Sequence, residues 1–144
     1  MDTQWIKTPA APARLALLVW MLALAAGAQA QKANTWKGGT PGQETNWNCP
    51  QNWSTNAVPD AFSDVVIPDV STSTFAAPVI RTGTHEVNAL LLLSGARLTI
   101  EADANLIVLM HLEIVPNAVV QGKGLLLFQE ENGGLEAGTA SGGR

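Results

Sequence analysis

The stretch ALLLLSGARLTIEADANLIV, residues 89–108, contains short apolar segments separated by Ser-Gly and Asp-Ala-Asn. The next stretch, MHLEIVPNAVVQGKGLLLF at residues 110–128, repeats this pattern at an offset of about 20 to 22 residues. In the alignment LLLL lies over HLEI, SGARLTI over PNAVVQG, and DANLIV over KGLLLF. Apolar and polar residues alternate at Leu98, Thr99 and Ile100, which is typical of β-strands. The sequence therefore predicts a repeat whose units contain three short strands each.

A single unit of three short strands cannot bury its apolar face, but a second unit stacked on it can cover that face and pair its backbone. Asn88, Asn105 and Asn117 lie near the expected corners, where asparagine tolerates turn dihedrals. We therefore predict an all-β fold, a short right-handed parallel β-helix or solenoid. The alternative is an antiparallel β-sandwich, although no Asn-Gly or Asp-Gly dipeptide for tight hairpins lies between these strands.

The first thirty residues have the pattern of a signal peptide. Lys7 and Arg14 precede the apolar run LALLVWMLALAA at residues 15–26, and GAQA then supplies the small residues that signal peptidase accepts. The run is shorter than the ~20 apolar residues of a membrane-spanning helix. We therefore predict cleavage after Ala30, a secreted or cell-surface location, and no membrane association after cleavage.

The charge and the cysteine content exclude several classes of function. The chain carries 8 Lys and Arg against 12 Asp and Glu, so it offers no basic surface for nucleic acid. Cys49 is the only cysteine, which excludes an internal disulfide and predicts a small buried thiol. His85 and His111 lie in strand-like segments with no motif that would activate Cys49 as a nucleophile. We predict no catalytic residues.

The stretch NWNCPQNWSTNAVPDAFSDVVIP, residues 46–68, contains two Asn-Trp pairs. Trp36, Trp47 and Trp53 are the candidate ligand-binding residues, because three indole rings can form a platform on which sugars stack. In the other interpretation these rings cover the first layer of the repeat, each burying a large apolar area. Because NCPQN between Trp47 and Trp53 is typical of a turn, no flat array is specified, and we favour the covering role.

No cofactor and no metal site is predicted. Asp60, Asp64 and Asp69 lack the alternating spacing and the glycine of a calcium-binding loop. Asp64 is instead interpreted as capping the turn before the Val-Val-Ile strand. The Gly-Lys-Gly at residues 122–124 lacks the further glycine and the Ser or Thr of a phosphate-binding loop.

Several of these motifs together carry a resemblance to a family. TWKGG at residues 35–39, the segment NWNCPQNWSTNAVPDAFSDVVIP and the following ladder resemble the N-terminal region of large secreted surface proteins of the Bacteroidetes type. The resemblance covers residues 35–128 and is most specific from 47 to 68. It implies an exported, adhesin-like β-helix protein. Many such proteins carry a C-terminal sorting domain for type IX secretion, which residues 129–144 do not match.

These observations predict a signal peptide at residues 1–30, a Trp-rich capping segment at 31–69, solenoid coils at 70–128 and a disordered, glycine-rich tail at 129–144. Repeat proteins generally need three or more units, so we expect a fragment whose last coil contacts further coils of a longer chain. The predicted function is that of an exported, structural or adhesin-like surface protein without catalytic activity. An extracellular glycan or a host surface is the expected partner. The alternative is a carbohydrate-binding or polysaccharide-processing β-helix protein whose active coils lie outside this chain.

Overall fold

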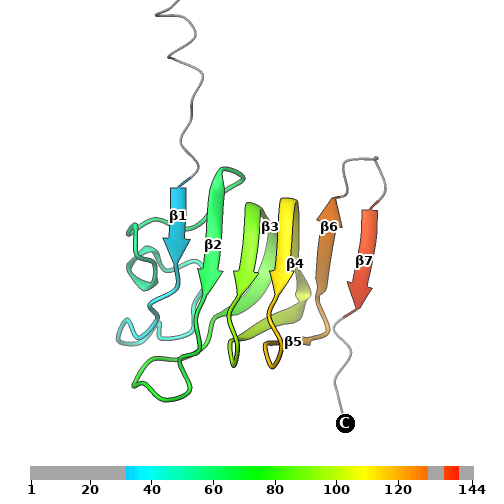
Figure 1. The fold of residues 1–144 in the computed structure, drawn as a ribbon. Coiled ribbons are helices and arrows are strands. Elements are labelled where there is room, and N and C mark those ends of the chain that lie inside the picture. Colours follow the sequence, from blue (N-terminus) through cyan, green and yellow to red (C-terminus); the bar gives the residue numbers. More distant parts are fainter. Residues whose placement is uncertain (1–31, 130–134, 140–144) are drawn as a thin grey trace, which may run out of the picture. The chain divides into compact units, whose positions relative to one another are not determined.

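The structure, a computed structural model, describes residues 32–129 and 135–139 (Figure 1). All described residues belong to one compact unit, Gln31–Arg144. The predicted signal peptide therefore lies outside the described residues. Within the described ranges, no helix has the length and apolar character needed to cross a membrane.

The described residues form an all-β fold with one mostly parallel sheet. Its strands are β1 (Lys32–Thr35), β2 (Ser63–Ile67), β3 (Val79–Leu92), β4 (Arg97–Ile114), β5 (Val119–Gly122), β6 (Leu125–Gln129) and β7 (Leu135–Thr139). The order across the sheet is β1-β2-β3-β4-β6-β7, and β5 pairs with β4 (Figure 1). The pairs among β1 to β6 are parallel, and β6 pairs antiparallel with β7. The all-β prediction is confirmed, and the antiparallel sandwich is wrong.

The long strands β3 and β4 bend at two positions. Their register shifts at Arg81 and again at Asn88, and at each point two residues of β4 face one residue of β3. An extra residue in one strand bends the pair locally. Each strand is thereby divided into three segments, and Figure 1 shows their earlier parts curving behind the front row of arrows. The sequence prediction of a corner near Asn88 is confirmed.

Two tight turns, residues 93–96 and 115–118, return the chain to the start of the next layer. In each turn the fourth amide donates to the first carbonyl, at 2.9 Å and 3.0 Å. The third residues, Gly95 and Asn117, have positive φ values of 80° and 72°, as a type II turn requires. The corner predicted near Asn117 is confirmed. Asn105 lies inside β4, in register with Leu125 of β6, and directly follows the corner of β4 at residues 101–104.

The register agrees with most of the alignment. Arg97 pairs with Val119, which places SGARLTI beside PNAVVQG. Asn105 pairs with Leu125, which places DANLIV beside KGLLLF. The alignment of LLLL with HLEI is wrong by one residue. It placed Leu90 beside His111, whereas in the structure Ala89 pairs with His111.

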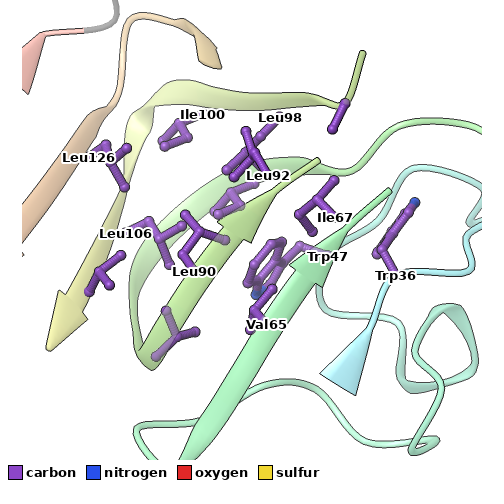
Figure 2. Close-up of a cluster of buried hydrophobic side chains, with 14 of the residues drawn as sticks. Trp36, Trp47, Val65, Ile67, Leu90, Leu92, Leu98, Ile100, Leu106 and Leu126 are labelled. Carbon is purple, nitrogen blue, oxygen red and sulfur yellow. The ribbon is translucent and has the colours of Figure 1, made fainter. Parts of the chain in front are cut away.

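The core lies between the segments of these bent strands. In β2 buried residues alternate with half-buried ones, as expected of a strand with one face inward. Register pairs align inward residues of successive layers in rows, such as Val65, Leu90 and Leu112. Figure 2 shows Val65, Leu90 and other buried side chains of this core meeting in one interior. Each large side chain that is fully buried there stabilises the fold by roughly 1.5–3 kcal/mol relative to an exposed one.

Two predicted boundaries differ from the structure. The expected capping segment, residues 31–69, contributes β1 and β2 to the sheet. The expectation of disorder from residue 129 does not hold for Gln129, at the end of β6, or for β7. In the sequence an Asn-Gly dipeptide, a strong hairpin signal, lies between these two strands. Residues 130–134 and 140–144 lie outside the described residues.

Candidate functional site

The tryptophan cluster, formed by Trp36, Trp47 and Trp53, is buried. The exposed fractions of the three residues are 1%, 0% and 0%. The Trp53 ring lies 5.0 Å from that of Trp36 and 4.7 Å from that of Trp47, with interplanar angles of 79° in both pairs. Such edge-to-face contacts are the favoured packing of aromatic rings. The interpretation of these residues as a sugar-stacking platform is wrong, because no ring presents an open face.

The cluster extends the apolar rows of the sheet. Trp36 follows β1, and the backbone hydrogen bonds of this segment to β2 place it next to Ile67. The bridge between Asn46 and Val79 places Trp47 next to Ile80. Figure 2 shows Trp36 and Trp47 beside the side chains of β2. The indole rings therefore cover the first layer, as the covering interpretation predicted.

Hydrogen bonds hold two of the three indole nitrogens. Trp36 Nε1 donates to the carbonyl of Ala76 at 2.8 Å, and Trp53 Nε1 donates to the carbonyl of Trp47 at 2.8 Å. Trp47 Nε1 is buried and has no partner among the described residues, although the ring lies 6.3 Å from that of His85. The cluster is thus tied both to itself and to the loop before β3.

Asn52 organises the capping segment from its interior, and sequence reasoning missed it. This residue is fully buried, and its Oδ1 accepts from the amide of Thr40 at 3.0 Å. Its Nδ2 donates to the carbonyls of Gln43 and Asn46, at 2.6 Å and 3.1 Å. A buried side-chain amide with both ends satisfied stabilises one loop conformation. The only sequence signal was its place before Trp53 in the second Asn-Trp pair.

The three aspartates have separate structural roles. Asp60 caps the turn before β2, because its Oδ1 accepts from Ser63 Oγ at 2.9 Å. The prediction that Asp64 has this role is wrong, since Asp64 lies inside β2 and accepts from Asn88 Nδ2 at 2.6 Å. Asp69 accepts from the backbone amide two residues later. Within residues 32–129 and 135–139, no three His, Cys, Asp or Glu side chains are grouped to hold a metal ion.

Cys49 is a buried free thiol, as predicted. Its Sγ lies 3.2 Å from Gln51 Oε1. His85 Nε2 lies 3.1 Å from a backbone carbonyl in its own strand, and His111 lies 3.6 Å from the carboxylate of Glu113 on the surface. In the described part of the chain, no hydrogen bond joins either histidine to Cys49.

The opposite end of the parallel layers has an open edge, formed by residues 111–114 of β4 and by β5. Among the described residues β5 pairs only with β4, so its other side has no strand partner. The inward-facing Leu112 and Val120 are only half-buried there. Met110 and Ile114 are 70% and 45% exposed. The apolar rows therefore reach this edge without a cover.

One family model matches the part of the sequence that contains both the tryptophan cluster and the parallel layers. The family model described as Domain of unknown function (DUF8693) matches residues 35–132. The chain belongs to this family. The DUF8693 match begins at the last residue of β1 and extends past the end of β6, so it includes both ends of the parallel stack. No curated protein and no solved structure matches the chain.

Proposed function

We propose that this chain is an exported structural protein of the adhesin-like, cell-surface class, without catalytic activity of its own. In this proposal the residues after Ala30 form the N-terminal cap and the first coils of a right-handed parallel β-helix, on which further coils stack. The observation that carries the proposal is the difference between the two ends of the layers. The tryptophan cluster covers one end, whereas at the other end the apolar rows through Leu112 and Val120 are uncovered and only β6 has a further partner, β7.

The path of the chain supports a helical winding. The bends at Arg81 and Asn88 divide β3 into three segments, β4 is divided in the same way, and each is paired in parallel with the next layer. The turns at residues 93–96 and 115–118 then begin a new layer. About 98% of crossover connections between parallel strands of one sheet are right-handed, which favours the same hand here.

The backbone of the first layer supports its role as a terminal cap. The amide of Thr35 is not free to pair with a further strand, because it donates to Ser54 Oγ at 2.9 Å. The carbonyl of Thr35 accepts from the amide of Ser54, also at 2.9 Å. Satisfying an edge strand in this way prevents unwanted pairing with another chain. Solenoid proteins generally need such terminal caps.

The open edge supports the stacking of further coils. A strand placed beside residues 111–114 and β5 would pair their free backbone groups and extend the rows that contain Leu112 and Val120. Stacked coils form extended, repetitive surfaces of the kind that repeat proteins use for binding. The small-residue pattern that ends at Ala30 supports export of this stack.

Expression of the full chain in a Gram-negative host tests the exported role. We expect cell fractionation and mass spectrometry to find a chain that begins at Gln31 in the envelope or the medium. The matched control is the double variant Ala28→Arg/Ala30→Arg, which removes the small residues required for cleavage and should keep its N-terminal segment. Recovery of the unmodified chain in the cytoplasm with that segment intact would contradict the proposal.

A further inference from the structure

A small surface hollow lies between the loop that joins β2 to β3 and the start of β4. Its volume is about 160 Å³. The loop contributes Asp69, Ser71 and Phe75 to the lining, and the other side contributes Gly95 and Arg97. With Ser73, which also lines it, the hollow combines one aromatic ring with a carboxylate, two hydroxyls and a guanidinium. None of the buried tryptophans lines it.

The capping segment fixes the position of the aromatic ring. The bond from Trp36 Nε1 to the carbonyl of Ala76 anchors the loop one residue after Phe75. The amide of Phe75 donates to Ser73 Oγ at 3.1 Å. A Cβ added to Gly39 would lie 2.6 Å from Phe75 Cδ1, so the ring rests directly on the backbone of this glycine. Phe75 is nevertheless 49% exposed, which leaves part of the ring accessible to a ligand.

The charged groups of the hollow retain binding capacity. Asp69 Oδ1 accepts from the amide of Ser71 at 2.8 Å, and a Cβ on Gly95 would meet the other oxygen, Oδ2, at 2.5 Å. Hydrogen bonds from Ser71, with a smaller contribution from the charge of Arg97, hold the pKa of Asp69 below its ordinary value. Within the described ranges, the Arg97 guanidinium donates no hydrogen bond to another residue. An ionised acceptor and an unused donor thus line the same hollow.

We propose that this hollow binds one neutral pyranose unit of a glycan, with a C–H face of the sugar on Phe75 and two neighbouring hydroxyls held by Asp69 and Arg97. A hydroxyl both donates and accepts, so one can donate to the carboxylate while the next accepts from the guanidinium. The electron-rich face of an aromatic ring attracts the C–H groups of a sugar. The two opposite charges nearly cancel, which favours an uncharged ligand. The inference goes beyond the exported, structural role and does not rest on it.

The size of the hollow supports a single sugar unit. Pockets for drug-sized ligands have volumes of about 300–1,000 Å³, well above this one. A larger hollow of about 560 Å³ lies beside Arg81, but it has no aromatic lining residue. Its polar groups also bond to each other, since Arg81 donates to Thr45 Oγ1 and Asn46 donates to Gln43 Oε1. The smaller hollow is therefore the better candidate for a sugar.

Titration of the ¹⁵N-labelled chain with methyl glycosides of glucose, galactose, mannose and N-acetylglucosamine tests this proposal. We expect at least one glycoside to shift the amide signals of Ser71, Phe75 and Gly95 in a saturable manner, with a Kd in the millimolar range. The Phe75→Ala variant should weaken this binding at least about tenfold. The Arg97→Gln variant should weaken the binding by a similar factor. Because Arg97 is exposed, this variant tests the proposal even if Phe75→Ala disturbs the loop.

The matched control is Phe62→Ala, since Phe62 is also an exposed phenylalanine, at 63%, but does not line the hollow. Its glycoside affinity should equal that of the unmodified chain. The proposal is wrong if none of the four glycosides gives saturable shifts at concentrations up to about 100 mM. It is also wrong if the Arg97→Gln variant binds as tightly as the unmodified chain.

Discussion

At the scale of single residues, Trp53 joins the parts of the capping segment. Its ring contacts both Trp36 and Trp47 edge-to-face, and none of its surface is exposed. Its Nε1 also satisfies the carbonyl of Trp47. Truncation of Trp53 would therefore leave a cavity between two rings and a buried carbonyl without its donor, and both effects are destabilising.

We predict that Trp53→Ala lowers the free energy of unfolding by about 3–5 kcal/mol, the usual cost of truncating a buried aromatic residue. Urea denaturation followed by circular dichroism measures this loss. Phe62→Ala is the matched control, and its effect should stay within about 0.5 kcal/mol because the ring is exposed. Equal losses in the two variants would show that Trp53 does not support the fold.

The sequence predicted the burial of the tryptophans but not the bonds that position them. Burial follows from ring size and from the turn between Trp47 and Trp53, both of which are local features. The role of Asn52 depends on loops brought together by folding, since Thr40 and Gln43 approach it from an earlier part of the segment. The same limit explains the error at Asp64, because its partner Asn88 belongs to another strand.

At the scale of elements, the corner between β5 and β6 explains the Gly-Lys-Gly motif. The pairs of Ile100 with Gly122 and of Asn105 with Leu125 leave four residues at the corner of β4 but only two in the next layer. The shorter corner brings the two backbones together. A Cβ on Gly122 would lie 1.9 Å from the carbonyl oxygen of Ile100. A Cβ on Gly124 would lie 2.4 Å from the carbonyl oxygen of Glu101. The glycines are therefore required by sterics.

We predict that Gly122→Ala destabilises the fold by at least about 2 kcal/mol more than Gly83→Ala, because the added methyl group overlaps backbone atoms. Gly83 is the matched control. It also has a positive φ, of 85°, but the nearest atom to an added Cβ is 3.8 Å away. Urea midpoints of the two variants provide the comparison. Similar midpoints would mean that the corner is not closely packed.

The register could be predicted where the chain is regular and not where it bulges. The alignment of SGARLTI with PNAVVQG was right because each segment begins within a tight turn of equal length, which leads directly into the paired strands. The alignment before this turn was wrong by one residue, because the shift near Asn88 adds a residue to β4. Bulges depend on how two strands bend together, and a single strand sequence carries little information about that.

At the scale of the whole described unit, the two ends of the parallel layers differ in chemistry. The first layer is closed by the tryptophan cluster and by Ser54, whereas the open edge exposes apolar side chains and unpaired backbone. An exposed strand edge promotes association with other strands. We therefore propose that the layers are stackable units, with a closed first layer and a last layer that is open along residues 111–114 and β5, beside the pair of β6 with β7.

Duplication of one layer tests whether the layers stack as repeating units. A second copy of residues 97–118 can be inserted after Ala118. The first Arg97 would then pair with the second Arg97, and the second with Val119, so the offset between layers is the same at both junctions. Because a stacked layer contacts only its neighbours, we expect a folded chain with a higher urea midpoint and a larger m value than the unmodified chain. The same inserted residues in scrambled order are the control and should lower the midpoint. A duplicated chain whose midpoint is no higher than that of the unmodified chain would contradict the account.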